Sequence, residues 1–326
     1  MGVGIGLLLA SGLLPASASP VSAPSAVVSP AAGGHVYVTN QLDNTVSVID
    51  VRTNKVVATV PVGMAPEGVA VAPDGRHAYI AANGSAEVSV LDTRTNRVTA
   101  SVPVGKDPSG VELSPDGRFL YVANGGSDSV SVLDTRTNRV TASVPVGTSP
   151  VSVAVSRDGA AAYVADSGSS SVSVIDTRTR RTVRVLPGGR SPVGVTVAPD
   201  GRSIYVADEV AASVSVVGTR TGTVTATVPV GEGPFDVALG PDGRSAYVAV
   251  LGPGKVAVID TRGHRVSGTV SVGPPGTDPF NVAVTSGAVY VTQQGAGTLA
   301  VIDPKTLKVV TTVTVGSSPY GVAVSP

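Results

Sequence analysis

The chain has 326 residues, of which 42% are hydrophobic, 14% charged and only 3% aromatic; its 39 glycines and 25 prolines favour strands and tight turns over helices. Because 23 basic and 23 acidic residues cancel, bulk attraction to nucleic acid or to an anionic membrane is not indicated. The absence of cysteine excludes disulfides, thiolate metal sites, a cysteine nucleophile and a lipid-modified cysteine.

The N-terminal segment has the pattern of an export signal. An apolar run over residues 5–14 is followed by Pro15 and by Ala16-Ser17-Ala18, the small-x-small pattern of a signal-peptidase site. We therefore predict a signal peptide over residues 1–18, a Ser/Pro/Ala-rich linker over 19–34 and a secreted protein; a disordered apolar tail is the alternative. The run is shorter than the ~20 residues of a transmembrane anchor. The basic residues that usually precede the apolar run of a signal peptide are absent, since the first Lys or Arg of the chain is Arg52.

A repeat fills the rest of the chain. A tyrosine that begins a Tyr-Val or Tyr-Ile segment recurs every 42 residues, and once after 43, at Tyr37, Tyr79, Tyr121, Tyr163, Tyr205, Tyr247 and Tyr290. A Pro-x-x-Val motif also occurs seven times, beginning at Pro66, Pro108, Pro150, Pro192, Pro234, Pro279 and Pro319. Each period is therefore one structural unit.

The unit over residues 108–147 predicts four strands, at 110–113, 119–124, 130–134 and 140–146, separated by turns that contain Asp-Gly or Asn. No segment has a helical pattern. A period of ~40–45 residues with four strands is typical of a β-propeller blade. Residues 35–326 therefore predict an all-β, seven-bladed β-propeller with four antiparallel strands per blade.

The order of the strands within a blade can also be predicted. A proline recurs in the fourth strand, at Pro61, Pro103, Pro145, Pro187 and Pro229, and proline is tolerated only in an edge strand, so this strand is outermost. The first unit begins at its second strand, whereas residues 317–326 repeat only the first strand. We expect the C-terminal strand to complete blade one and close the ring, with burial of Tyr320, Val322 and Val324.

These blocks resemble a known family. Tyr37-Val38-Thr39-Asn40, with the repeated Val-Ala-Val-x-Pro-Asp-Gly-Arg and Val-Ser-Val-Ile/Leu-Asp-Thr-x-Thr-Asn segments, is similar to the YVTN-family β-propeller repeat over residues 35–326. The resemblance implies an exported or surface-layer-like bacterial propeller. Distant seven-bladed relatives include lactonase-like and streptogramin-lyase-like enzymes and the haem domain of cytochrome d1, so the fold does not decide between a binding protein and an enzyme.

The residues most often used in catalysis are sparse. His35, His77 and His264 all lie off the innermost strands, which argues against haem ligation, a histidine base or a histidine metal site in the channel. An aspartate ends the third strand of six blades, and this repetition favours turn capping over catalysis.

Three polar residues interrupt the small residues expected near the propeller axis. Asp236 and Asn281 stand where the other blades have Gly or Ser, and Glu112 stands two residues further along, where the others have Ala or Thr. We predict that they line the central channel and bind a polar ligand or a hard cation such as Ca²⁺. Asp236 and Asn281 would hold the metal and Glu112 would lie nearly opposite; alternatively, water and neighbouring backbone satisfy all three.

Charge is divided between the two rims. We assign twelve acids and three basic residues (Lys106, Arg190 and Lys255) to the "acidic rim", formed by the loops between strands two and three and between blades. The acids are Asp43, Glu67, Glu87, Asp107, Glu112, Asp128, Asp166, Asp208, Glu209, Glu232, Asp236 and Asp278. The "basic rim", formed by the Asp-Gly-Arg and Asp-Thr-Arg-Thr-Asn turns, has nineteen Lys and Arg against eleven Asp, with Arg178, Arg180 and Arg181 most closely clustered.

The pattern therefore predicts an exported, non-enzymatic binding scaffold, whose basic rim suits an anionic cell-wall or surface polymer or a protein partner. The alternative is a lactonase-like hydrolase or lyase that uses a carboxylate-held metal at Glu112, Asp236 and Asn281. A nucleic-acid site is not indicated, because the basic rim lacks aromatic residues for base stacking. No cofactor is indicated with certainty.

Overall fold

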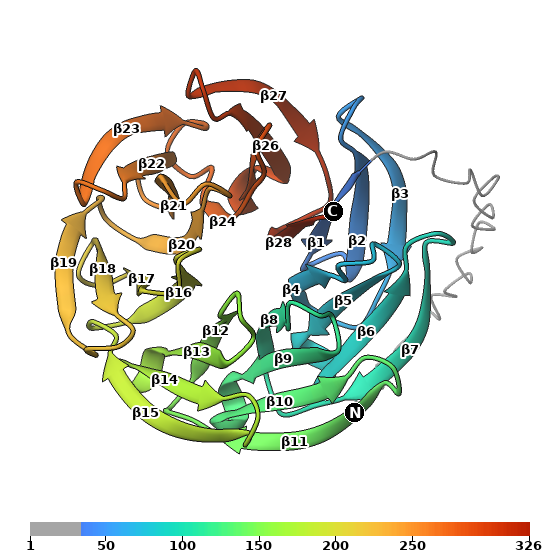
Figure 1. Ribbon diagram of the computed structural model, residues 1–326. Helices are drawn as coiled ribbons and strands as arrows, with labels where there is room; N and C mark the ends of the chain where they lie inside the picture. The colour runs from blue at the N-terminus through green and yellow to red at the C-terminus, as the bar shows by residue number, and fades with distance from the viewer. Residues whose placement is uncertain (1–33) are drawn as a thin grey trace, which may run out of the picture.

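The computed structural model describes residues 34–326 as a ring of seven four-stranded antiparallel sheets (Figure 1), which confirms the seven-bladed propeller. The predicted signal peptide and all but the last residue of the predicted linker lie outside the described residues.

Each blade contributes one strand to each of four concentric layers. The innermost strands are β28 (Pro319–Val324), β4 (Pro66–Val71), β8 (Pro108–Leu113), β12 (Pro150–Val155), β16 (Pro192–Val197), β20 (Pro234–Leu239) and β24 (Pro279–Val284). The second strands are β1 (His35–Asn40), β5 (His77–Ala82), β9 (Phe119–Asn124), β13 (Ala161–Asp166), β17 (Ser203–Asp208), β21 (Ser245–Val250) and β25 (Val289–Gln293). The third strands are β2 (Thr45–Asp50), β6 (Glu87–Asp92), β10 (Ser129–Asp134), β14 (Ser171–Asp176), β18 (Ser213–Gly218), β22 (Lys255–Asp260) and β26 (Thr298–Asp303). The outermost strands are β3 (Lys55–Pro61), β7 (Arg97–Pro103), β11 (Arg139–Pro145), β15 (Arg181–Pro187), β19 (Val224–Pro229), β23 (Arg265–Ser271) and β27 (Lys308–Thr314).

The predicted strands of residues 108–147 agree with β8 to β11 to within two residues at each end. The described chain contains no α-helix, as predicted, but it has four single-turn 3₁₀ segments between second and third strands: η1 (Asn83–Ser85), η2 (Gly125–Ser127), η3 (Ser167–Ser169) and η4 (Gln294–Ala296). All four segments contain Gly and three of them Ser, and none has a hydrophobic period, so sequence periodicity does not reveal them.

Turn chemistry explains why the strands end where they do. Gly75 and Asn54 have φ of +68° and +53°, a conformation that Gly and Asn adopt more readily than other residues. The Oδ1 atom of Asp50 accepts hydrogen bonds from the backbone N–H of Arg52 at 3.0 Å and of Thr53 at 2.9 Å. The aspartates that end the third strands therefore cap turns, as the repeat indicates.

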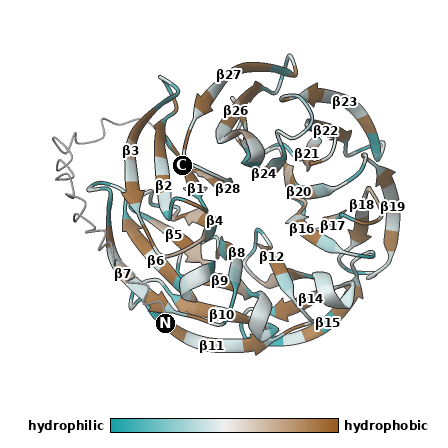
Figure 2. Cartoon of the chain, turned by 180° about the vertical axis from the view of Figure 1, so that it is seen from behind, coloured by the Kyte–Doolittle hydropathy of each residue, from teal (hydrophilic) through white to brown (hydrophobic). Residues whose placement is uncertain are grey.

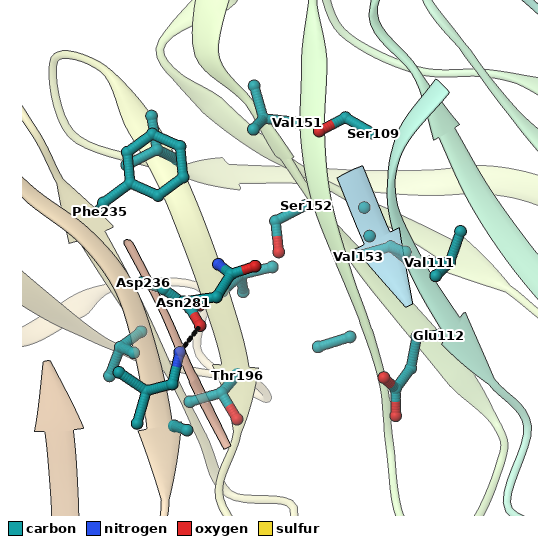
Figure 3. Close-up of a pocket in the computed structure, with 18 of the residues that line it drawn as sticks. Ser109, Val111, Glu112, Val151, Ser152, Val153, Thr196, Phe235, Asp236 and Asn281 are labelled. Atoms are coloured by element: carbon teal, nitrogen blue, oxygen red, sulfur yellow. Dashed lines mark hydrogen bonds between the residues drawn. The ribbon is translucent and has the colours of Figure 1, made fainter. Parts of the chain in front are cut away.

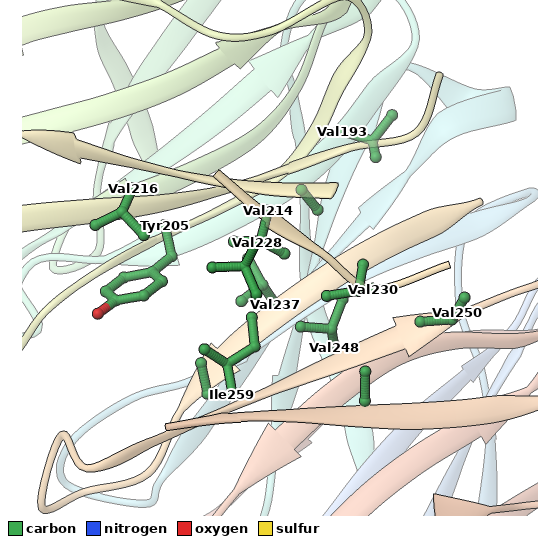
Figure 4. Packing of buried hydrophobic residues seen from close by; sticks show 13 residues of the cluster. Val193, Tyr205, Val214, Val216, Val228, Val230, Val237, Val248, Val250 and Ile259 are labelled. Carbon is green, nitrogen blue, oxygen red and sulfur yellow. The ribbon is translucent and has the colours of Figure 1, made fainter. Parts of the chain in front are cut away.

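Seven hydrophobic clusters hold neighbouring blades together, one at each interface. In the cluster between blades five and six (Figure 4), Val214 and Val228 of one blade pack against Val237 and Val248 of the next. The repeated tyrosine adds a polar contact, since the Tyr37 hydroxyl hydrogen-bonds a threonine of the following blade while burial raises its pKa to about 12. In Figure 2 the hydrophobic residues, in brown, lie mainly along the strands of the blades, and the hydrophilic residues, in teal, mainly in the connecting turns.

The C-terminal strand closes the ring. β28 pairs antiparallel with β1, placing Val324 opposite Val36 and Val322 opposite Val38. This confirms that blade one combines three N-terminal strands with one C-terminal strand. The expected full burial of Tyr320, Val322 and Val324 is wrong: all three are only half-buried, because the innermost strand borders the open channel.

Two buried threonines tie β28 to its neighbours. Thr292 Oγ1 donates to the Tyr320 carbonyl at 2.7 Å and accepts from the Asn281 N–H at 2.9 Å. Thr39 Oγ1 donates to the Glu67 carbonyl at 2.6 Å and accepts from the Gly321 N–H at 2.8 Å. The innermost strands of blades seven, one and two are thus linked in series.

Candidate functional site in the central channel

The innermost strands surround a cavity of about 360 Å³ on the propeller axis. Figure 3 shows Phe235 near one end of this cavity, Asp236 and Asn281 together on one wall, and Glu112 across from them. Ser152 and Thr196 add hydroxyl groups to the lining. The volume is in the range that encloses a small molecule.

Glycines near the axis allow the innermost strands to approach closely. A Cβ atom on Gly110 would lie 2.6 Å from the Val151 carbonyl of the next blade, and one on Gly194 would lie 2.7 Å from the Phe235 carbonyl. Both distances are shorter than real Cβ contacts, so crowding excludes larger side chains here. A blade that carries a polar side chain at this position needs a compensating contact.

Asp236 has such a contact. Its Oδ2 atom accepts a hydrogen bond from the Val282 N–H of β24 at 3.0 Å, and its carboxylate also hydrogen-bonds the Asn281 side chain. Burial nevertheless raises the pKa of Asp236 above its usual value. Asp236 and Asn281 are therefore brought together as predicted, and part of their hydrogen-bonding capacity joins blade six to blade seven.

Glu112 lies on the opposite wall. In β8 it pairs with Tyr121, the third residue of β9, and only Leu113 separates it from the turn after the strand. Its assignment to the acidic-rim side of the channel is therefore wrong, because an innermost strand runs from the acidic rim to the basic rim and Glu112 is near its far end. Its side chain is exposed to the channel, yet enclosure by the surrounding blades raises its pKa to about 7.

The carboxylates do not form a convergent metal cluster. Within residues 34–326, no group of three or more His, Cys, Asp or Glu side chains is placed to hold a metal ion. Asp236 and Asn281 supply one carboxylate and one amide, whereas calcium takes six to eight oxygen ligands. A calcium ion bound by this pair would need water for most of its coordination.

An aromatic cluster at the acidic-rim end of the channel is absent from the sequence predictions. Phe235, Phe280 and Tyr320 occupy the position directly after the repeated proline in three successive blades, and Glu67 occupies it in the next blade. The sequence does contain evidence for this cluster, because two of the chain's only three Phe residues and the one tyrosine outside the repeated position all follow the repeated proline.

The acidic rim has fewer surface charges than the sequence indicates. Asp166 and Asp208 end second strands on the side of this rim, as assigned, but they are 0% and 2% exposed and so add no surface charge to it. Asp208 accepts three backbone N–H groups, from Arg190, Ser191 and Ala211. Glu112 and Asp236 lie within the channel. The remaining eight acids are exposed or half-buried and still outnumber Lys106, Arg190 and Lys255.

The basic rim presents its arginines to solvent. Arg178 and Arg181 are exposed, while Arg180 is half-buried with its Cζ atom 5.0 Å from the centroid of the Phe119 ring. Arg118 lies at 5.1 Å from the same ring. All four ion pairs of residues 34–326 involve basic-rim arginines, each more than half exposed, so most basic residues of this rim have no acidic partner.

A family model described as "Lactonase, 7-bladed beta-propeller" matches residues 53–185, from the outer turn of blade one into β15 of blade four. No curated protein matches the chain significantly. Among the residues that the structure describes, no helix combines the length and hydrophobicity needed to span a bilayer.

Solved structures with the same fold cover most of the chain. Kuenenia stuttgartiensis hydrazine synthase is 26% identical with a TM-score of 0.74, over 82% of this chain and 91% of that one. Dihydro-heme d1 dehydrogenase NirN is 19% identical with a TM-score of 0.66, over 86% of this chain and 63% of that one. A functionally unknown protein from Desulfotomaculum acetoxidans is 18% identical with a TM-score of 0.76, over 89% and 98% of the two chains. The chain is therefore a seven-bladed propeller similar to lactonase-type propellers and to proteins of several activities.

Proposed function

We propose that this protein is an exported binding scaffold that uses its basic rim to hold an anionic surface polymer. The observation that carries the proposal is the separation of charge: the basic rim has eight more basic than acidic residues in a chain of zero net charge. Arg178 and Arg181 extend into solvent, and the stacking of Arg118 and Arg180 on Phe119 holds two guanidinium groups in place. Guanidinium groups bind phosphate and carboxylate groups through paired hydrogen bonds.

Replacing Arg178, Arg180 and Arg181 together by Ser should weaken retention on an anionic cell-wall fraction, and on linear polyphosphate as a defined probe, by about tenfold or more at low salt. The matched control replaces Lys106, Arg190 and Lys255 of the acidic rim by Ser, which removes the same charge from the other face. Equal losses in both triple variants would mean that net charge alone governs retention and would refute the proposal. Unchanged retention in the first variant would also refute it.

Lactone hydrolysis in the channel is the second candidate function, and two observations favour it. The lactonase family model matches part of the chain, and Glu112 places a carboxyl group with a pKa of about 7 in the cavity. Such a carboxylate can take a proton from water as the oxygen adds to the lactone carbonyl carbon; the ring C–O bond then breaks and the proton passes to the departing ring oxygen. The product is the open hydroxy acid.

Glu112→Gln should lower the rate of γ- and δ-lactone hydrolysis by about 10²–10⁴-fold, the usual contribution of a general base. The rate of the parent should rise with pH through about 7, as Glu112 loses its proton. Glu209→Gln, an exposed acidic-rim residue, is the control and should have no effect. A parent that hydrolyses none of these lactones, or a Glu112→Gln variant with full activity, would exclude this candidate.

A further inference from the structure

Three aromatic rings meet at the acidic-rim mouth of the channel. They come from successive innermost strands: Phe235 from β20, Phe280 from β24 and Tyr320 from β28. The ring centroids of Phe235 and Phe280 lie 3.7 Å apart, those of Phe280 and Tyr320 4.5 Å apart, and Tyr320 meets Phe235 edge to face at 6.0 Å. All three residues are only half-buried, so part of this aromatic surface is open to a ligand.

Carboxylates adjoin these rings. Glu67 of β4 lies beside the Tyr320 hydroxyl and Ser109, and its Oε1 atom accepts a hydrogen bond from Gln41 Nε2 at 3.2 Å. Burial raises the pKa of Tyr320, and the negative charges of Glu67 and Asp236 raise it further. Burial also raises the pKa of Glu67 and of Asp236, because no positive charge offsets the cost of ionising them.

The cavity itself supplies no counter-charge. Its lining contains Glu112 and Asp236 but no Lys, Arg or His. A cation that enters from the mouth therefore meets the aromatic rings first and carboxylates next, without repulsion from a basic side chain of the lining.

We propose that this mouth, formed by Phe235, Phe280, Tyr320 and Glu67, binds the ammonium group of a small organic cation. Aromatic faces attract cations through their quadrupole, and a carboxylate at the side of the rings adds a direct charge interaction. A bare metal ion fits this place poorly, since three of the four side chains offer carbon surfaces where a metal needs oxygen ligands. The cavity below, of about 360 Å³, accommodates the rest of a small molecule. This site is on the opposite rim from the proposed polymer site and does not depend on it.

The test is calorimetric titration of the full chain with choline, with ethylammonium, and with 3,3-dimethylbutan-1-ol, the uncharged isostere of choline. We expect choline or ethylammonium to bind at least about tenfold more tightly than the isostere. The comparison of the two cations shows whether a methylated or an unmethylated ammonium group is preferred. Glu67→Gln and Phe280→Leu should each weaken the binding by about five- to tenfold, whereas Glu209→Gln, the same substitution at an exposed position of the same rim, should leave it unchanged.

Several outcomes would overturn the proposal. Equal binding of choline and its isostere would identify an apolar pocket without charge recognition. Binding of Ca²⁺ that is lost in Asp236→Ala, with no binding of either ammonium ion, would identify a metal site instead. Full ammonium binding by both Glu67→Gln and Phe280→Leu would place the ligand elsewhere. Thermal melting of each variant establishes that it is folded, and Phe235→Leu replaces Phe280→Leu if the latter does not fold.

Discussion

Deletion of residues 317–326 is expected to lower the melting temperature by about 10 °C or more and to promote aggregation. The deletion removes β28, leaves the inner edge of β1 unpaired and takes Val322 and Val324 from the cluster between blades seven and one. Half-burial of three large side chains contributes about 2–5 kcal/mol, before the lost backbone hydrogen bonds are counted. A domain of ordinary stability, ~5–15 kcal/mol, would lose a large fraction of it.

The control for this deletion removes only Pro326, which is exposed and follows the last strand. Thr39→Ala and Thr292→Ala weaken the attachment of β28 without removing the strand, because each threonine links β28 to a neighbouring strand. Alanine stands at the matching position of the other five blades, so the fold accommodates it. Each should cost about 1–3 kcal/mol, because the substitution leaves buried backbone groups without a partner. If the chain without residues 317–326 melts within about 2 °C of the parent, the ring does not depend on closure by β28.

Asp166→Asn is expected to stabilise the protein by about 2–3 kcal/mol at neutral pH. Asp166 is fully buried, and burial raises its pKa to about 6 from an ordinary value of 3.8. The folded state therefore binds a proton more tightly than the unfolded state. The resulting stability is fully present below the unfolded pKa and is lost as the pH rises through about 6. An uncharged amide removes this loss.

The propeller contains its own precedent for the substitution. Asn124 stands at the matching position of blade three, where its Nδ2 atom donates to Ser131 Oγ at 3.0 Å. In blade four, Ser173 Oγ donates to Asp166 Oδ2 instead, at 2.6 Å, and the Ser173 backbone N–H donates to the same oxygen at 3.0 Å, one backbone donor against the three of Asp208. The hydroxyl group can reverse its role, so asparagine fits the same hydrogen bond.

Asp208→Asn is the matched control for Asp166→Asn and should destabilise the protein. Both carboxylate oxygens of Asp208 accept backbone N–H groups, three in all. Asparagine replaces one of these oxygens by an NH₂ group, which cannot accept a hydrogen bond, so at least one backbone N–H would lose its acceptor. Urea unfolding of both variants from pH 4 to pH 8 measures the effects. The difference between Asp166→Asn and the parent should vanish near pH 4. A difference that is independent of pH would show that the charge of Asp166 is not the cause.

Most of the fold can be predicted from the sequence because each blade repeats the same turn residues and the same strand pattern. Asn54 and Gly75 mark turns that need a positive φ, Pro61 marks an edge strand, and the unpaired first-strand sequence at the C-terminus can pair only with β1. These rules depend on near neighbours in the chain, so they apply equally in every blade. The buried ends of the second strands are harder to predict, since Asp166 looks like a surface charge until the loop between blades covers it.

The channel site is only partly predictable. Comparing the blades at the positions of Asp236 and Glu112 finds the polar residues, but the position directly after the proline must be compared as well to find Phe280 and Tyr320. A β-bulge at the start of the innermost strands interrupts the alternation of side chains between the two faces of the sheet. Consecutive residues such as Phe235 and Asp236 can therefore both border the channel. The height of Glu112 along the axis follows only from its pairing with Tyr121.

Hydrogen exchange of the full chain, with and without linear polyphosphate at low salt, tests the proposed scaffold function most directly, because it locates the binding face without any substitution. We predict slower exchange in the basic-rim turns, above all at residues 115–118 and 177–181, and reversal of this protection as salt is added. Protection confined to the acidic-rim loops, or no protection on either rim, would contradict the proposal that the basic rim holds an anionic polymer.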